Sequence, residues 1–242
     1  MHLGQQLVKV KRKSVSLDGV DIPFSDDVTC LGVVFDNELK FSTGVVFDNE
    51  VKFSTHIKRL AWKCFYHLRQ MRSVRCSLSV DAAKTVVNAL IISRIDYCNS
   101  VFSQVTVIHL CPLQSVLNAA AWLIVKKRKY DPITATIREV LHWLPIQQRI
   151  EYKLCDLVYK AMHHTALVYL MELCVPVSLH QGRANLRSAT HGDLSVAANK
   201  DTTYGRRSYA VSGPTTWNAL SLSTREQSQS RTVSQSSQDG TN

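Results

Sequence analysis

The stretch at residues 56–75 reads HIKRLAWKCFYHLRQMRSVR, and its apolar residues recur at intervals of three and four. This period predicts an amphipathic α-helix. Its predicted buried stripe is Ile57, Leu60, Ala61, Cys64, Phe65, Leu68 and Met71. The same stretch contains no acidic residue and six basic ones, which are Lys58, Arg59, Lys63, Arg69, Arg72 and Arg75. These cations have two interpretations, a solvated face without a partner or a surface that contacts phosphate groups. Solvated helix faces usually mix both signs of charge, which favours neither interpretation alone.

Further helices follow this one. Ser79 is a suitable N-cap for a second helix, with Asp81 in its first turn. A third is expected to open at Pro112, because proline suits a first-turn position. It ends in the cations Lys126, Lys127, Arg128 and Lys129, which either complement the helix C-terminus or form a second nucleic-acid patch. Residues 134–143 and 146–162 complete the helical part, and Trp143 and Trp217 are expected to be core or interface aromatics.

The N-terminal region shows the alternation of a β-strand. Residues 14–24, SVSLDGVDIPF, flank Asp18-Gly19 and predict a hairpin, and VTCLGVVF at 28–35 predicts a third strand pairing with it. Residues 32–43 and 44–55 are a tandem duplication in which 11 of 12 positions match. Two copies of this length cannot build a solenoid, so we interpret them as an insertion that the fold absorbs.

Composition excludes several classes of protein. The 242 residues carry 29 Lys+Arg against 19 Asp+Glu, a formal charge of +10, and 45% are hydrophobic. Such a chain can bury a core and favours an anionic partner. The longest apolar runs fall short of the roughly 20 residues that a membrane span needs, so no such helix is expected. The seven scattered cysteines predict buried free thiols rather than a disulfide framework or a metal site.

The C-terminal part is less regular. Residues 204–211 predict a short strand and Gly213-Pro214 a turn, whereas the Ser/Gln-rich residues 221–242 are expected to be disordered. Arg94 and Asp96 are expected to form a pair at the end of the second helix.

Several common catalytic motifs do not occur in the sequence. Phosphate-cradling glycine loops, GxSxG and HExxH do not occur. Asp26-Asp27 is the only adjacent acidic pair, and its setting after Pro23 predicts a loop rather than the paired carboxylates of a polymerase.

Several strings together carry a family resemblance: LGVVFD, SRIDYCNS at 93–100, LHWLP at 141–145 and GPTTWN at 213–218. With one duplicated copy removed, residues 3–220 resemble the part of non-LTR (LINE) retrotransposon reverse transcriptases, of the jockey and chicken-repeat type, that follows the catalytic palm. The resemblance implies that Leu31 and Gly32 belong to the primer grip and that the helices from His56 onward form the thumb. The six cations of residues 56–75 would then track phosphates of a template-primer duplex.

The sequence also departs from that family. Its catalytic Asp-Asp motif, fingers and palm lie upstream of the matched region, so we expect no polymerase activity, no catalytic residue and no metal site in these residues, although the family uses Mg²⁺. Trp122 stands where relatives usually carry arginine.

The expected fold is mainly α with a small N-terminal antiparallel hairpin or sheet. Its expected parts are a palm and primer-grip remnant (1–55), a thumb-like helical bundle (56–131), C-terminal helices (132–178), a short irregular or β segment (179–220) and the tail (221–242). The expected function is that of a truncated reverse-transcriptase remnant that binds RNA or DNA duplex independently of sequence, inside the cell and without a membrane; the nucleus is where such a product would meet its target. The alternative is a non-catalytic protein-interaction piece, or a product without function, which self-associates through an exposed palm-facing surface.

Overall fold

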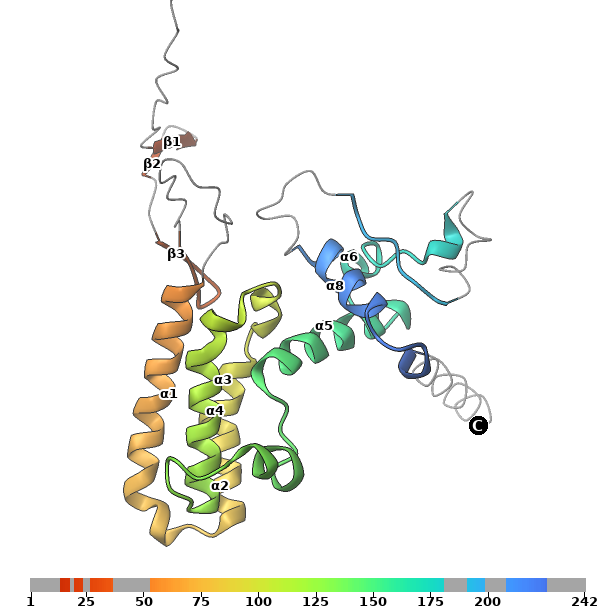
Figure 1. The fold of residues 1–242 in the computed structure, drawn as a ribbon. Coiled ribbons are helices and arrows are strands. Elements are labelled where there is room, and N and C mark those ends of the chain that lie inside the picture. The colour runs from red at the N-terminus through yellow and green to blue at the C-terminus, as the bar shows by residue number, and fades with distance from the viewer. Residues whose placement is uncertain are drawn as a thin grey trace, which may run out of the picture.

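The structure is a computed structural model that describes residues 14–17, 20–23, 27–36, 53–180, 191–198 and 208–225. It is mainly helical, with small antiparallel sheets near the N-terminus, so the predicted fold class is confirmed. Figure 1 shows the strands above one end of a helical bundle and the C-terminal helices beside it.

The N-terminal strands form two separate hairpins. β1 (Ser14–Leu17) pairs with β2 (Val20–Pro23) in the predicted hairpin, whose Asp18-Gly19 connection lies outside the described residues. β3 (Asp27–Cys30) pairs with β4 (Val33–Asp36), so the single third strand predicted over 28–35 is wrong. The chain reverses at Leu31 and Gly32, whose φ angles of 48° and 79° are both positive. Two positive φ angles are the signature of the tight turn that matches strand twist, and this turn divides the expected strand.

The first copy of the duplication supplies β4, and the second leads into the first helix, α1 (Ser54–Val74). Five of the seven predicted stripe residues of α1 are buried: Ile57, Ala61, Cys64, Leu68 and Met71. Leu60 is half-buried, but Phe65 is exposed, so its predicted burial is wrong. The buried stripe is narrower than the apolar one because the helices packed on α1 cover only part of its circumference.

The second helix begins as predicted. Ser79 caps α2 (Val80–Val87) by accepting a hydrogen bond from the Ala82 backbone N–H at 3.2 Å. The helix continues through a π-helical turn, η2 (Asn88–Ile92), into α3 (Ser93–Asp96). The 3-10 turns η1 (Arg75–Ser77) and η3 (Asn99–Phe102) connect this rod to its neighbours.

The third helix, α4 (Val107–Val125), begins five residues before the predicted start, and Pro112 lies inside it. Leu110 is 4% exposed, so the extra turn buries a large apolar side chain in the core. The helix also buries Leu113, Val116, Leu117, Ala120 and Ile124. Among the described helices, α4 alone is long and apolar enough to cross a membrane, with a mean hydropathy of 1.5. Polar residues interrupt this helix, so no unbroken apolar run indicates it in the sequence. Here it packs against α1 and α2 as the central core helix.

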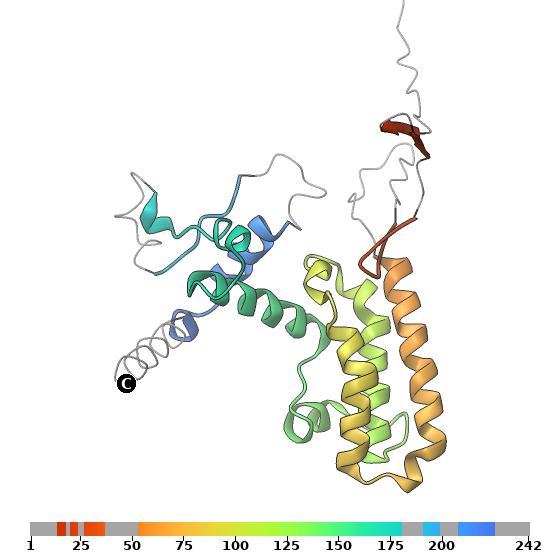
Figure 2. The same ribbon diagram turned by 180° about the vertical axis from the view of Figure 1, so that it is seen from behind.

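Helix α1, the α2–η2–α3 rod and α4 lie side by side as a three-helix bundle (Figures 1 and 2). α1 and α4 run away from the β3–β4 hairpin, and the rod returns toward it. One continuous apolar cluster fills the space between them and extends through η4 (Thr136–Val140) to Ile150.

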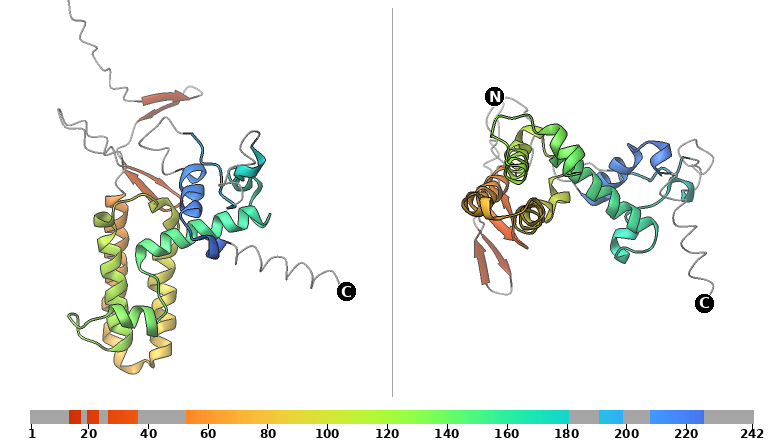
Figure 3. Two further views of the ribbon diagram at one scale, coloured as in Figure 1. Left: turned by 45° about the vertical axis from the view of Figure 1, so that its right-hand side comes forward. Right: turned by 90° about the horizontal axis from the view of Figure 1, so that it is seen from below.

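The helix α5 (Ile146–Met162) has the bounds predicted for it and joins two apolar clusters. Its Ile146 and Ile150 belong to the bundle core, whereas Val158 and Ala161 belong to a second cluster with Trp217. Figure 3 shows α5 leading out of the bundle toward the short helix α6 (Val168–Met171) and toward α8 (Tyr209–Asn218).

The segment near residues 204–214, predicted as a strand and a turn, is helical from Tyr209 onward. Gly213 and Pro214 are buried inside α8, so the predicted turn is wrong, as is the strand for Tyr209–Val211; residues 204–207 lie outside the described part. Gly213 packs closely against α5, because a Cβ at this position would lie 3.1 Å from Val158 Cγ2. The 3-10 turn η5 (Val177–Leu179) directly follows Pro176, which forms an isolated β-bridge with Leu194.

Residues 221–225 are ordered, contrary to the disorder expected from 221 onward. Arg225 is 6% exposed, forms an ion pair with Asp193, and donates its backbone N–H to the Ser221 carbonyl. The rest of the predicted tail, 226–242, lies outside the described residues.

All seven cysteines are free thiols, but only Cys64 and Cys174 are buried. Cys30, Cys76 and Cys111 are exposed, so the prediction that the thiols are buried is wrong for these three. Trp143 and Trp217 are 7% and 2% exposed, which confirms their core assignment.

Candidate nucleic-acid interface

The predicted cations of α1 lie on its outer side, away from the bundle core. The helix contains no Asp or Glu between its bounds. Five of the six predicted side chains are exposed: Lys58, Arg59, Lys63, Arg69 and Arg72. From Lys58 to Arg72 they extend over about 21 Å of helix, at roughly 1.5 Å per residue. We call these five residues the basic face.

Arg75 does not belong to the basic face, although the sequence placed it there. Its side chain is buried, and Nε donates to the Leu123 carbonyl oxygen at 2.7 Å. The same guanidinium donates to the carbonyls of Ile124 and Leu78. Arg75 therefore satisfies the last carbonyls of α4, the groups that a helix C-terminus leaves without intrahelical partners. A phosphate has no access to this side chain.

The basic face changes the electrostatics at the beginning of α1. Burial lowers the pKa of His56 from its ordinary value of 6.5, and the charges of Lys63 and Arg59 lower the pKa further. The positive potential thus acts on a neighbouring titratable group, and the same potential would attract an anion.

The second predicted cluster, Lys126 to Lys129, follows the end of α4 and is exposed at all four residues. Lys126 adopts φ 57°, the left-handed conformation that ends a helix. Lys127 Nζ lies 3.1 Å from Thr136 Oγ1, and Lys129 Nζ lies 5.4 Å from the centre of the Tyr130 ring. Arg75 links the two clusters, because it joins the end of α1 to the end of α4.

Trp122 stabilises the loop that carries this cluster. Its indole Nε1 donates to the Asp131 carbonyl oxygen at 3.0 Å, and Asp131 Oδ2 accepts the Arg128 backbone N–H at 2.8 Å.

The predicted primer-grip residues Leu31 and Gly32 form the exposed tip of the β3–β4 hairpin. The Tyr97 hydroxyl donates to the Leu31 carbonyl oxygen at 2.9 Å. The hairpin is also tied to α1, because the Val34 backbone N–H donates to His56 Nδ1 at 3.2 Å. The β3–β4 hairpin and the C-terminal end of α4 lie at opposite ends of the bundle (Figure 1). Lys126–Lys129 directly follow that end of α4, and the basic face belongs to α1, which extends between the two ends.

Sequence reasoning missed three aromatic side chains on the outer side of α1. Trp62, Phe65 and Tyr66 are exposed, and the rings of Trp62 and Tyr66 stack at a centroid distance of 6.3 Å. Trp62 and Tyr66 stand four residues apart and off the apolar stripe, which was the available signal.

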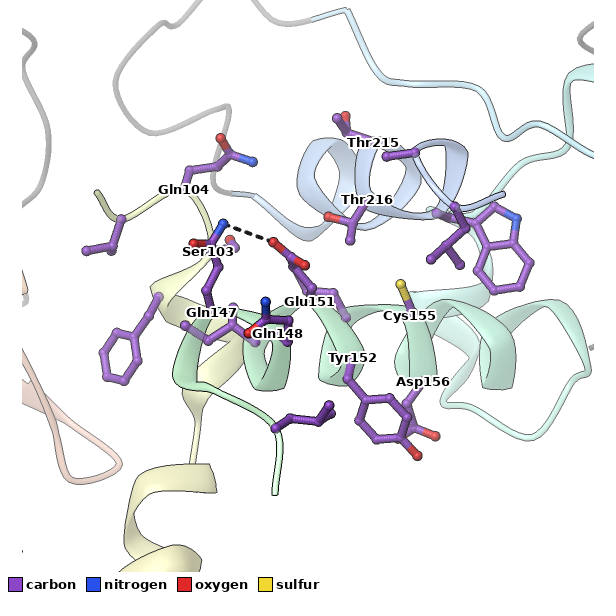
Figure 4. Close-up of a pocket in the computed structure, with 18 of the residues that line it drawn as sticks. Ser103, Gln104, Gln147, Gln148, Glu151, Tyr152, Cys155, Asp156, Thr215 and Thr216 are labelled. Carbon is purple, nitrogen blue, oxygen red and sulfur yellow. Dashed lines mark hydrogen bonds between the residues drawn. The ribbon is translucent and has the colours of Figure 1, made fainter. Parts of the chain in front are cut away.

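A groove of about 1350 Å³ lies between α5, α8 and the segment at 103–107 (Figure 4). Among the residues that the structure describes, its walls contain the carboxylates of Glu151 and Asp156 and no Lys, Arg or His. Glu151 accepts a hydrogen bond from Gln147, and Asp156 lies 2.9 Å from Lys160 Nζ. An acidic and apolar wall does not suit phosphate, so the groove is separate from the candidate interface.

Within the described ranges, the structure contains no group of three or more His, Cys, Asp or Glu residues that could hold a metal ion.

Comparisons with protein-family models, with curated proteins and with solved structures found no match for this chain.

Proposed function

We propose that this chain binds nucleic acid independently of sequence, through the basic face of α1. One observation carries the proposal: five exposed cations lie on a helix without a single carboxylate. Lysine and arginine side chains bind phosphate oxygens and displace counterions, which gives affinity without reading bases. The exposed cluster Lys126–Lys129 would extend the contact at the far end of the bundle.

We further propose that the chain derives from the primer grip, thumb and following helices of a LINE-type reverse transcriptase. The strings LGVVFD, SRIDYCNS, LHWLP and GPTTWN support this origin. The order of elements, a tight hairpin at Leu31–Gly32 joined to a helical bundle, is compatible with it.

The proposed activity is binding rather than polymerisation. Nucleotide transfer by two metal ions requires carboxylates held a few ångströms apart. Primer extension by the chain with Mg²⁺, compared with a reaction containing a chelator, tests this part: metal-dependent extension would overturn it.

Filter binding to a 20-base-pair duplex at two salt concentrations tests the binding proposal. We expect binding at low salt that weakens steeply as salt rises, because phosphate contacts release counterions. Failure to bind at low salt, or an affinity that ignores salt, would overturn it.

A matched pair of variants localises the site. Arg69→Gln with Arg72→Gln removes two charges from the basic face, and we expect the slope of log affinity against log salt to fall by about 2. Lys153→Gln with Lys160→Gln removes the same charge from α5, where both lysines lie beside Asp156. This control is expected to retain the wild-type slope, and equal losses in both variants would show that only the net charge matters.

A second candidate function is protein interaction or self-association. It is favoured by apolar side chains exposed at the hairpin end of the bundle, where Leu31 is 81% and Ile108 79% exposed. Size-exclusion chromatography over a range of concentrations and hydrophobic-dye binding test it. A monodisperse monomer without dye binding would contradict it.

A further inference from the structure

The outer side of α1 combines rings with charges. Trp62 is 70% exposed, Tyr66 49% and Phe65 39%. Lys58, Trp62, Phe65, Arg69 and Arg72 succeed one another at spacings of four, three, four and three residues, so they lie along one side of the helix. The second and third positions of this row are aromatic, and the other three are cationic. We call this row, together with Tyr66, the aromatic row.

The rings lie away from the core of the bundle. The buried side of α1 consists of Ile57, Ala61, Cys64, Leu68 and Met71, which face α4 and its neighbours. Trp62 and Tyr66 contact each other at 6.3 Å between centroids with an interplanar angle of 22°. That distance is near the upper limit of about 7 Å for paired rings, so much of each ring's surface stays in water.

Charge selects the kind of partner that covers these rings. A hydrophobic protein surface would bury Lys58, Arg69 and Arg72 beside the rings without compensation, since α1 supplies no carboxylate to pair with them. A partner with phosphates at its edge and flat apolar faces between them satisfies both kinds of side chain. Nucleic acid has this chemistry.

The rings further distinguish single strands from duplexes. In a duplex each base face is covered by its neighbours, so a ring on a helix surface would meet only sugars and phosphates. In a single strand the base faces are free to stack on aromatic side chains. Three exposed rings on one helix therefore gain contact only with an unpaired strand.

We propose that the aromatic row of α1 binds single-stranded nucleic acid in preference to duplex, with Trp62, Phe65 and Tyr66 stacking on bases between phosphates held by the cations. This rests on the proposed binding function and names its substrate class.

Tryptophan fluorescence of the full 242-residue chain gives a direct test. Among the four tryptophans, Trp62 is exposed, whereas Trp143 and Trp217 are buried and Trp122 is half-buried. Three probes carry the same number of phosphates: a 20-residue oligothymidylate, an abasic deoxyribose-phosphate chain, and a blunt hairpin duplex. We expect the oligothymidylate to quench the fluorescence and to bind most tightly, with both other probes binding through charge alone and quenching little.

Substitutions locate the effect. Trp62→Ala is expected to weaken oligothymidylate binding by about 5- to 150-fold, because each stacked base contributes roughly 1–3 kcal/mol. The same variant should leave duplex binding unchanged, and Trp62→Phe should restore most of the affinity. Tyr152→Ala is the matched control, because Tyr152 is a similarly exposed ring on α5.

The outcomes separate the two proposals. Salt-dependent binding to all three probes with equal affinity, and without loss in Trp62→Ala, would overturn the single-strand preference and leave the proposed function standing. Absence of binding to every probe would overturn both. A fluorescence change that follows protein concentration without nucleic acid would assign the aromatic row to self-association and overturn the inference.

Discussion

The backbone N–H of Val34 donates a hydrogen bond to His56 Nδ1 at 3.2 Å, and so joins the hairpin strand β4 to the first turn of α1. An imidazole nitrogen accepts such a bond only when it carries no proton. Burial, followed by the charges of Lys63 and Arg59, lowers the pKa of His56 below 6.5. The contact and the lowered pKa both favour the neutral imidazole in the folded chain.

This predicts a dependence of stability on pH. As pH falls through 6.5, the unfolded chain binds a proton at His56 before the folded chain does, so the free energy of unfolding decreases. The contribution is complete above that pH and is lost toward the lower pKa of the folded state. The pKa of His163 is also lowered, mainly by burial and further by His164, so His163 contributes to the same pH dependence of the free energy of unfolding. Urea unfolding between pH 5 and 8 measures the slope.

His56→Gln tests the assignment, since a glutamine amide oxygen can accept the Val34 N–H but does not titrate in this range. We expect a smaller slope in this variant. A slope identical to that of the wild type would show that His56 is not the titrating group.

Arg75 is expected to stabilise the fold rather than bind phosphate. Arg75→Met removes its hydrogen bonds to the carbonyls of Leu123, Ile124 and Leu78. We expect the free energy of unfolding to fall by about 3 kcal/mol, the size typical of buried hydrogen bonds to a charged group. Urea denaturation measures the loss, and Arg72→Met, at an exposed position, should stay within about 0.5 kcal/mol of wild type. A reduced salt dependence of nucleic-acid binding in a folded Arg75→Met protein would contradict this role.

Asp96 pairs with Arg149 of α5 and not with Arg94, which corrects the pair expected at the end of the second helix. Arg149 Nη1 lies 3.0 Å and 2.8 Å from the two carboxylate oxygens. Arg149→Gln is expected to lower the free energy of unfolding by about 1–2 kcal/mol, since the carboxylate is partly solvated. Arg94 is exposed, so Arg94→Gln serves as the control. Equal thermal unfolding of both variants would exclude the pairing as a stabilising contact.

Gly213 is expected to set the distance between α5 and α8. A Cβ there would lie 3.1 Å from Val158 Cγ2 and 3.2 Å from Tyr209 Cε2. We expect Gly213→Val to destabilise the chain by about 1–3 kcal/mol through overpacking. Hydrogen exchange should show the loss of protection in α8 and not in the three-helix bundle. Uniform loss of protection throughout would mean that the two clusters unfold as one unit.

Local signals made much of the bundle predictable. The 3.6-residue period located α1, the Ser79 cap located α2, and residues 146–162 matched α5 at both ends. The start predicted at Pro112 was wrong. Proline is most common in the first turn of a helix, but α4 begins at Val107, where the additional turn buries Leu110. Gly213-Pro214 misled for a similar reason, since a close contact with α5 outweighs the turn propensity of both residues.

The candidate interface was predictable only in part. Charge and period placed Lys58, Arg69 and Arg72 on the outer side of α1, because they depend on that helix alone. The burial of Arg75 depends on where α4 ends, which is a tertiary relationship. The exposure of Phe65 depends on how much of α1 its neighbours cover, and apolar periodicity carries no information about that.

The duplication gives the chain two nearly identical occupants for one place beside β3. When the first copy provides the strand beside β3, a loop of two residues connects the two strands. If residues 45–48 of the second copy provided it, the loop would have 14 residues. That difference favours the first copy by about 1.7 kcal/mol in loop-closure entropy. The connection to α1 has the opposite effect. It has 17 residues when the first copy provides the strand and would have five with the second, a difference of about 1.1 kcal/mol in loop-closure entropy in favour of the second copy.

The two connections therefore nearly cancel, and side chains cannot decide either, because Val33–Asp36 and residues 45–48 are the same four letters. What selects the strand is the tight turn at Leu31–Gly32, which only the first copy can use. Substitutions in β4 therefore act directly on the hairpin, although the same four letters occur again at residues 45–48.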